Sequence, residues 1–314
     1  MTVTLDDIRA ARTRLAGAAH VTRVETCSTL DRLAGRELFF KCEHLQKGGA
    51  FKFRGACNAV APLDDETARR GVVTHSSGNH AGALALVAKR RGIPAWIVMP
   101  RTASPIKRRA VEEYGGIVVS CEPNQQAREE AANRIQSETG ATLIPPYDHP
   151  DIIAGQGTIA LELLEQVPDL DAILAPVGGG GLMAGLCVAA HGINPRVRVI
   201  ATEPKGADDA WRSFTSGTWT PQTGPKTIAD GLLTSLGQIT WPILKEHLDR
   251  VICVSEEEIV SALRLARERA KLLIEPSSAV PLAAILGEEG RALEGLKRVA
   301  IVLSGGNVSV ESVA

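Results

Sequence analysis

Lys52 stands between Phe51 and Phe53 in the stretch GGAFKFRGA, and Arg54 follows close by. A surface lysine needs no such setting, because its ammonium group stays in water while its stem lies along the protein surface. A lysine that is desolvated by apolar neighbours and lies near another cation instead has a lowered pKa, so its neutral amine can act as a nucleophile or a base. The stretch therefore predicts a reactive amine at Lys52, and an ordinary surface lysine is the alternative.

Four consecutive glycines, Gly178, Gly179, Gly180 and Gly181, separate an apolar run from a helix-like segment in APVGGGGLMAGL. Their backbone N–H groups can converge on a phosphate at the positive end of the following helix. The spacing matches neither the GxGxxG motif of dinucleotide-binding folds nor the GxxxxGK[ST] motif of nucleotide-binding loops. The sequence predicts a phosphate site here. A flexible turn is the alternative, but four glycines have an entropy cost that a turn does not require.

Hydroxyl and amide side chains gather in THSSGNHAG, at a second junction between a strand-like and a helix-like segment. Ser76, Ser77 and Asn79, with the backbone N–H groups around them, could hold a carboxylate or a phenolate oxygen. Capping of the helix by Ser77 or Asn79 is the alternative, and His80 alone indicates a structural histidine. In VLSGGNV, Ser304 could present a hydroxyl group to a ring nitrogen, and an ordinary turn is the alternative.

Two carboxylates and a main-chain carbonyl could converge in TEPKGADDA, where Glu203 ends a strand-like run and Asp209 follows six residues later. With the carbonyl oxygen of Ala207 they would offer hard oxygen ligands to Mg²⁺ or Ca²⁺. The alternative is that Asp208 and Asp209 stabilise the N-terminus of the next helix. Taken alone, these residues favour the alternative.

The bulk properties favour a small-molecule partner. The chain has 314 residues, and 35 basic against 36 acidic side chains give a net charge of -1, which offers no electrostatic surface for nucleic acid or an anionic membrane. The six cysteines show no CxxC pairing, which indicates reduced thiols and a cytoplasmic protein. No apolar segment typical of a secretory signal is present at the N-terminus. The uncharged run 172–190 contains a proline and four consecutive glycines, so we expect a strand, a loop and a helix there and no membrane span.

Strand-like and helix-like segments alternate over most of the chain, which predicts an α/β protein with largely parallel, covered sheets. One series runs from GVVTHS to a polar helix over 124–139 and closes with the proline-rich ATLIPPYDHP. A second series runs from GQGTIALELLEQV to RVAIVLSGGN. We expect a small mobile lobe over residues 71–147 and a large lobe formed by residues 1–70 and 148–314.

Taken together, these segments resemble the fold-type II family of pyridoxal 5'-phosphate enzymes, and within it the serine/threonine dehydratase and serine racemase branch. The resemblance covers nearly the whole chain, with FKFRGA, SSGNH, IAGQGTIALELL, GGGGL, TEPKGADDA, KTIADGL, KLLIEPSSA and LSGGNV in family order and at family spacing. It implies a fold similar to the tryptophan synthase β subunit, with two lobes that each contain a mostly parallel twisted sheet flanked by helices. It also implies that the cofactor is pyridoxal 5'-phosphate.

The resemblance implies a role for each motif toward the cofactor. Lys52 would hold the cofactor as a Schiff base and later act as the base at Cα. Phe51 would lie against the cofactor ring, Asn79 would meet its 3'-oxygen, and Ser304 would face the pyridine nitrogen. The four glycines 178–181 would bind the phosphate.

Further residues would act on the substrate or hold a metal. By the same resemblance, Ser76, Ser77 and Arg128 would contact the substrate carboxylate as the small lobe closes, and Ser77 would supply a proton on the opposite ring face in a racemisation. The segment with Glu203, Ala207 and Asp209 is similar to a divalent-cation site of racemase-like members, which implies bound Mg²⁺ or Ca²⁺. These assignments rest on the family pattern and not on spacing.

Three positions depart from that pattern. Ala50 stands where many relatives have serine, and Gly82 stands where glutamine is usual, so contacts near the cofactor and on the following helix can differ. Tyr147 in PPYDHP belongs to a loop form familiar from dehydratases and some racemases, whereas other racemases have asparagine there. These departures leave the side chain of the substrate open.

The resemblance implies a dehydratase, or ammonia-lyase, that converts a 3-hydroxy amino acid such as L-serine, L-threonine or 3-hydroxyaspartate into a 2-oxo acid and ammonia. A serine or aspartate-type racemase with side dehydratase activity is the alternative. A β-replacement enzyme of the cysteine synthase kind is disfavoured by SSGNH, TIADG and the EP pair, and a non-catalytic ligand-binding protein is the remaining competitor. We expect a homodimer in the cytoplasm.

Overall fold

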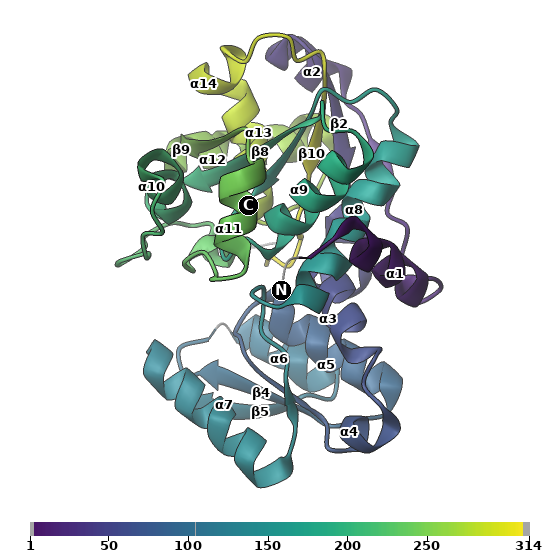
Figure 1. Ribbon diagram of the computed structural model, residues 1–314. Helices are drawn as coiled ribbons and strands as arrows, with labels where there is room; N and C mark the ends of the chain where they lie inside the picture. The colour runs from purple at the N-terminus through teal and green to yellow at the C-terminus, as the bar shows by residue number, and fades with distance from the viewer. Residues whose placement is uncertain (1–2, 104, 310–314) are drawn as a thin grey trace.

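Two separate sheets organise the computed structural model, which describes residues 3–103 and 105–309 (Figure 1). The strands of the larger sheet are β1 (Val24–Glu25), β2 (Glu37–Lys41), β7 (Ala172–Pro176), β8 (Arg198–Pro204), β9 (Arg250–Val254) and β10 (Arg298–Val302). The strands of the smaller sheet are β3 (Val72–His75), β4 (Ala95–Pro100), β5 (Ile117–Cys121) and β6 (Thr142–Leu143). We call the part of the chain around the larger sheet the large lobe and the part around the smaller sheet the small lobe.

Helices follow most of the strands. The α-helices are α1 (Leu5–Leu15), α2 (Ser28–Ala34), α3 (Lys52–Val60), α4 (Asp65–Arg69), α5 (Asn79–Arg91), α6 (Pro105–Glu113), α7 (Gln125–Thr139), α8 (Pro150–Gln166), α9 (Gly181–Ile193), α10 (Asp209–Ser216), α11 (Thr240–His247), α12 (Glu256–Leu265), α13 (Pro276–Leu286) and α14 (Glu288–Arg291). The shorter turns are the 3₁₀ helices η1 (Glu43–Leu45), η2 (Lys47–Gly49) and η3 (Asp230–Leu232) and the π-helical turn η4 (Ala266–Ala270).

The larger sheet has the order β1-β2-β10-β7-β8-β9, and all its neighbouring strands are parallel except the pair β1 and β2. Helices cover both faces, so alternate residues of one strand enter different cores. In β10, Ala300 and Val302 pack with residues of α1, α8 and α9, whereas Val299 and Ile301 pack with residues of α2, α12 and α13. The positions of β10 that are buried on the two sides, 299–302, are accordingly all apolar.

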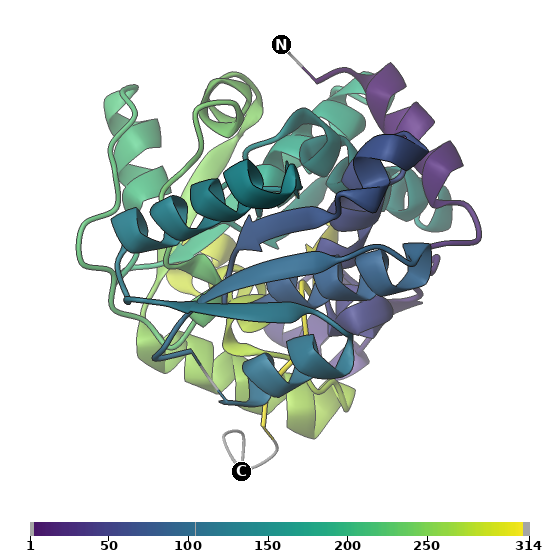
Figure 2. The same cartoon turned by 90° about the horizontal axis from the view of Figure 1, so that it is seen from below.

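The smaller sheet is entirely parallel, with the order β5-β4-β3-β6. Figure 2 looks onto this sheet from below and shows helices on both of its faces. Val72 and Ile97 pack toward α3 and α5, whereas Val73 and Val98 pack toward α7. Helix α3 thus contributes to the small-lobe core while it also packs against α8 of the large lobe.

Helix α8 lies in the interior and contacts α1, α3 and α9. Pro150 occupies its first turn, and His149 at the N-cap accepts a hydrogen bond from the backbone N–H of Asp151 at 3.2 Å. All residues in 152–163 are buried, which agrees with a helix that is apolar on nearly every side. This helix therefore packs on all sides against other parts of the fold.

The α/β class and the covered, mostly parallel sheets predicted from the sequence are confirmed. The run 172–190 forms β7, a glycine loop and the start of α9, as expected. No helix within the described ranges is long and apolar enough to cross a membrane. The sequence pattern gave no indication of the antiparallel β1 or of the pairing that places β10 between β2 and β7, because both depend on contacts distant along the chain.

Candidate active site

The amine of Lys52 lies in a desolvated position at the start of α3. Its Nζ donates a hydrogen bond to the carbonyl oxygen of Pro146 at 2.6 Å and lies 5.1 Å from the centroid of the Phe51 ring. Burial lowers the pKa of Lys52 to about 8, and the carboxylate of Glu275 opposes part of this shift. The amine can therefore lose its proton near physiological pH far more readily than an ordinary lysine, as a nucleophile or base requires.

Arg54 does not have the role that the sequence suggested for a second cation beside Lys52. Its guanidinium is buried and forms ion pairs with Glu43 and Glu162. The positive charge is thus balanced by two carboxylates, and burial, not a neighbouring cation, is the largest cause of the lowered pKa of Lys52.

The glycine loop between β7 and α9 requires glycine for steric reasons. Gly180 has a φ of 88°, and a Cβ atom there would lie 2.7 Å from Oγ1 of Thr240. A Cβ atom on Gly179 would lie 2.2 Å from the ring of Tyr147. Gly180 is also the N-cap of α9, and no side chain caps this helix end. The free N–H groups at the positive end of a buried helix fit an anion such as a phosphate.

Two adjacent residues of one segment contact Lys52 and the glycine loop. Pro146 accepts the hydrogen bond from Lys52, and the next residue, Tyr147, packs against Gly179. The segment between β6 and α8 thus contacts both the amine and the candidate phosphate site.

Asn79, at the first position of α5, contacts the large lobe. Its Nδ2 donates to both carboxylate oxygens of Glu275, at 2.8 and 3.1 Å, and its Oδ1 accepts from Nδ2 of Asn307 at 3.0 Å. Burial raises the pKa of Glu275 to about 7, although the bond from Asn79 opposes this shift. Glu275 was not among the residues predicted from the sequence. The available signal was an acidic residue inside the apolar segment KLLIEPSSA.

Ser304 lies at the end of β10, where its side chain is buried. Its hydroxyl oxygen is 2.9 Å from that of Ser278, and Ser278 also accepts a hydrogen bond from the backbone N–H of Gly305 at 2.7 Å. The next residue, Gly305, lies close to Glu275, because a Cβ atom on Gly305 would lie 2.7 Å from the Glu275 carboxylate. Ser278 is a second polar residue that the sequence did not single out.

Ser76 and Ser77 are half-buried between β3 and α5, while Arg128 lies on α7. The Nε of Arg128 is buried and has no hydrogen-bond partner within the described part of the chain. No side-chain hydrogen bond joins Arg128 to either serine within the same ranges, although its charge lies close enough to His75 to affect the pKa of that residue. The neighbouring His80 is fully buried, its Nε2 is 3.0 Å from the carbonyl oxygen of Ile144, and burial lowers its pKa to about 3. His80 therefore fits the structural role expected for it.

Glu203 and Asp209 lie together at the end of β8 and the start of α10, and both are 1% exposed. Glu203 accepts hydrogen bonds from the backbone N–H groups of Ala210 and Trp211, at 3.3 and 2.5 Å, so it caps α10. Asp209 accepts from the backbone N–H of Leu236 at 2.9 Å. Burial raises the pKa of Asp209 to about 6 and that of Glu203 well above its usual value.

A cation would stabilise the ionised forms of these two buried carboxyl groups, and Ala207 lies between them in sequence with its side chain buried. However, residues 3–103 and 105–309 contain no group of three or more His, Cys, Asp or Glu side chains arranged to hold a metal. A cation here would need the Ala207 carbonyl and water molecules to complete its ligand shell.

Comparison with known proteins identifies the enzyme family of the chain. The chain matches the family of pyridoxal-phosphate dependent enzymes over residues 15–305. It belongs to this family. It is 50% identical over 315 residues to serine racemase from Dictyostelium discoideum, with 100% of this chain and 97% of the relative covered. It is 48% identical over 308 residues to β-hydroxyaspartate dehydratase from Paracoccus denitrificans, with 98% and 97% covered. The structure of maize serine racemase has a TM-score of 0.98 at 46% identity, with 99% and 96% covered.

These findings confirm the family and the fold-type II architecture, and they identify the chain as a pyridoxal-phosphate-dependent enzyme related to racemases and dehydratases. The residues present fit the cofactor on structural grounds. A desolvated amine at Lys52, an uncapped helix end at Gly180 and a buried hydroxyl at Ser304 are the kinds of groups that an aldehyde, a phosphate and a pyridine ring need.

Proposed function

We propose that this enzyme is a dehydratase that converts a 3-hydroxy amino acid, such as L-serine, L-threonine or 3-hydroxyaspartate, into a 2-oxo acid and ammonia. The observation that carries the proposal is the hydroxyl pair of Ser278 and Ser304, 2.9 Å apart. This pair lies close to the start of α3, because the backbone N–H of Phe51, next to Lys52, donates to the carbonyl oxygen of Ser304 at 3.0 Å. A hydroxyl group does not hold a pyridine nitrogen protonated as a carboxylate would. It therefore favours expulsion of a β-substituent over reactions that store charge on the ring.

The residues of the chain would act in a definite order. The backbone N–H groups of Gly178, Gly179, Gly180 and Gly181 would bind the phosphate, with Asn79 and Phe51 placing the ring and Ser304 facing its nitrogen. Lys52 would hold the cofactor covalently. When bound, the cofactor would supply a sink for the electron pair that remains when the Cα proton leaves. Nζ of Lys52, freed by the substrate amine, would take that proton and pass it to the β-hydroxyl group, which would depart as water. The product would be released as 2-aminoacrylate, and water would hydrolyse its imine tautomer to the 2-oxo acid and ammonia.

Serine or aspartate-type racemisation is the second candidate, because the Dictyostelium serine racemase is 50% identical over the whole of this chain. Racemisation needs a proton donor on the ring face opposite Lys52. We propose Ser77 for this role. The two activities can coexist, because they share the removal of the Cα proton by Lys52 and differ only in the step after it, which is either loss of the β-hydroxyl group or return of a proton to Cα.

Closure of the small lobe over the substrate would complete the site. We propose that residues 71–147 move against 1–70 and 148–314, and that Ser76, Ser77 and Arg128 then contact the substrate carboxylate. The unpartnered Nε of Arg128 supports this idea, because a buried guanidinium nitrogen without a hydrogen bond is energetically unfavourable. Small-angle X-ray scattering with and without substrate would test it, and an unchanged radius of gyration would contradict it.

A structural Mg²⁺ or Ca²⁺ at Glu203, Asp209 and the carbonyl of Ala207 is proposed on the basis of the two buried carboxylates. We further propose a homodimer in the cytoplasm. The six cysteines are all free thiols, which supports a reducing compartment. Sedimentation equilibrium would test the oligomeric state.

The decisive experiment for the function is incubation of the cofactor-loaded enzyme with a panel of 3-hydroxy amino acids. Formation of 2-oxo acid and ammonia from one of them supports the dehydratase, whereas inversion at Cα without 2-oxo acid supports the racemase. Lys52→Ala should abolish both reactions and the visible absorbance of the linked cofactor. Persistence of a cofactor link that borohydride can reduce in this variant would contradict the role of Lys52.

A further inference from the structure

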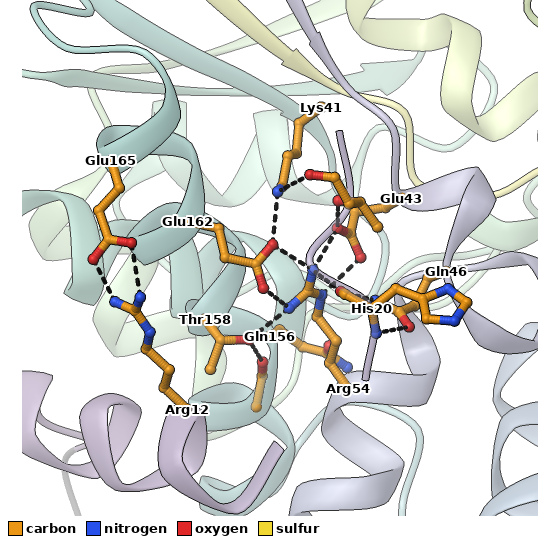
Figure 3. Close-up of polar contacts among 12 residues, drawn as sticks. Arg12, His20, Lys41, Glu43, Gln46, Arg54, Gln156, Thr158, Glu162 and Glu165 are labelled. Atoms are coloured by element: carbon orange, nitrogen blue, oxygen red, sulfur yellow. Dashed lines mark hydrogen bonds and ion pairs between the residues drawn. The ribbon is translucent and has the colours of Figure 1, made fainter. Parts of the chain in front are cut away.

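Arg54 lies two residues after Lys52 and anchors the first turn of α3 in the large lobe. Its guanidinium donates to both carboxylate oxygens of Glu43, each at 2.8 Å, and to both of Glu162, at 2.6 and 2.8 Å (Figure 3). Lys41 donates to Glu162 from the other side at 2.6 Å. Glu162 belongs to α8, so this four-residue cluster ties α3 directly to the buried helix.

The cluster balances two positive and two negative charges in the interior. The exposed fractions of Lys41 and Glu43 are 0%, that of Arg54 is 1% and that of Glu162 is 7%. Burial opposes ionisation of Glu43, but the charges of Arg54 and Lys41 outweigh it and lower its pKa. Charges buried this deeply stay ionised only while their partners keep their positions. The planar guanidinium donates in a rigid fork, so it also fixes the direction in which its carboxylate partners lie. A single ammonium group cannot do this.

Glycines allow the backbone of α8 to lie directly against the backbones of α3 and α9. A Cβ atom on Gly155 of α8 would lie 2.7 Å from Cα of Gly55 and 2.8 Å from the carbonyl oxygen of Arg54, both on α3. A Cβ atom on Gly185 of α9 would lie 2.5 Å from the backbone N of Gly157 on α8. Side chains cannot be inserted at either contact without moving a helix, because backbone atoms cannot rotate away.

These two contacts join the elements that carry the two proposed attachment points of the cofactor. Helix α3 begins at Lys52, and α9 begins at Gly181 in the glycine loop. We propose that α8 sets the separation between the Lys52 amine and the glycine loop, with Arg54 and Gly155 as positioning residues. This inference rests on the proposed function and adds to it the element that matches the site to the length of the cofactor.

Binding at two points explains why this separation matters. When one ligand is held by two groups, the second contact forms at a high effective concentration, and this gain is lost if the geometry forbids both contacts at once. The gain contributed by the phosphate is the ratio of two dissociation constants, that of pyridoxal divided by that of pyridoxal 5'-phosphate. A general loss of stability does not change this ratio, whereas a shift of α3 against α9 does.

The experiment measures this ratio for the enzyme and for three variants, from the visible absorbance of the covalently linked form. In Gly155→Ala and Arg54→Lys we expect the ratio to fall about 10-fold to 100-fold, because a displacement of about 1 Å can have an effect of that size. Gly290→Ala is the matched control, since its Cβ atom would lie 2.1 Å from the carbonyl oxygen of Ala284, far along the chain from either attachment point. It should lower the melting temperature and leave the ratio unchanged.

The outcomes separate this inference from the function on which it rests. If the unmodified enzyme binds pyridoxal 5'-phosphate no better than pyridoxal, the two-point site and the inference both fail. If it prefers the phosphate form but the ratio is unchanged in Arg54→Lys and in Gly155→Ala, the inference alone is overturned. An equal fall in Gly290→Ala also overturns it. Should Gly155→Ala not fold, Arg54→Lys decides, because it keeps the charge and removes only the fork.

Discussion

At the scale of one residue, the desolvated amine of Lys52 lowers the stability of the folded protein. Burial lowers its pKa from 10.5 to about 8 in the folded protein, whereas unfolding restores the usual value. Between these values the unfolded chain binds a proton that the folded chain lacks, so the free energy of unfolding rises with pH across this window. Below it both states are protonated, and the folded protein carries the full penalty of a buried charge.

We therefore expect Lys52→Met to raise the free energy of unfolding of the cofactor-free protein at pH 7 by about 1 to 3 kcal/mol. The difference from the unmodified protein should shrink as the pH rises from 8 toward 10.5. Urea unfolding at both ends of this range measures it. Equal stability of the two proteins at pH 7 would show that the amine is not desolvated in solution.

Ser77 gives a second prediction at the same scale. A general acid contributes about 10²-fold to 10⁴-fold to the step it serves, and only racemisation needs a proton from the face opposite Lys52. Ser77→Ala should thus reduce formation of the other enantiomer by at least about 10-fold more than formation of 2-oxo acid. Ser76→Ala is the matched control, because loss of a carboxylate contact should weaken both reactions together. Equal losses of racemisation and of 2-oxo acid formation in Ser77→Ala would show that Ser77 is not the proton donor.

At the scale of elements, the loop from β7 to α9 combines an unusual backbone conformation with close contacts. Gly180 has a φ of 88° and contacts Thr240, whereas Gly217 at the end of α10 has a φ of 69° and open space around it. Alanine at either position should lower the free energy of unfolding by about 1 to 2 kcal/mol through the left-handed backbone, and the clash with Thr240 should add to this cost at Gly180. Only Gly180→Ala should also weaken cofactor binding, measured by absorbance titration. Equal weakening of cofactor binding by Gly180→Ala and Gly217→Ala would show that the loop does not bind the phosphate.

The elements that sequence reasoning located correctly are those with a local signal. The glycine run between β7 and α9 combines an apolar strand, four residues without side chains and a new helix, all within one short segment. For Glu275 the local signal was only an acidic residue inside an apolar segment, and its partner Asn79 is 196 residues away, so its contact could not be predicted. The charges of Lys41 and Glu162 interrupt apolar runs in FFKCE and ALELL, but their pairing depends on how β2 and α8 approach each other in space.

At the scale of the whole molecule, a bound cation would stabilise the large lobe from a position away from Lys52. We expect a chelator to lower the melting temperature by about 5 °C and to reduce turnover, and added Mg²⁺ or Ca²⁺ to restore both. Asp209→Ala should abolish this response. Asp208→Ala is the matched control, since that carboxylate pairs with Arg212 at 2.8 Å, and it should keep the response. Indifference of the unmodified protein to chelation would exclude the cation site.

β10 lies between β2 and β7 but comes after both of them in the chain. While the ribosome is still adding the preceding residues, the larger sheet cannot close, and β2 and β7 present open backbone edges that favour pairing with other chains. The smaller sheet instead draws its strands from one continuous stretch, 72–143, and can fold earlier. The nascent chain would carry a finished small lobe and an unfinished large one, and insertion of β10 would cover the open edges of β2 and β7 together.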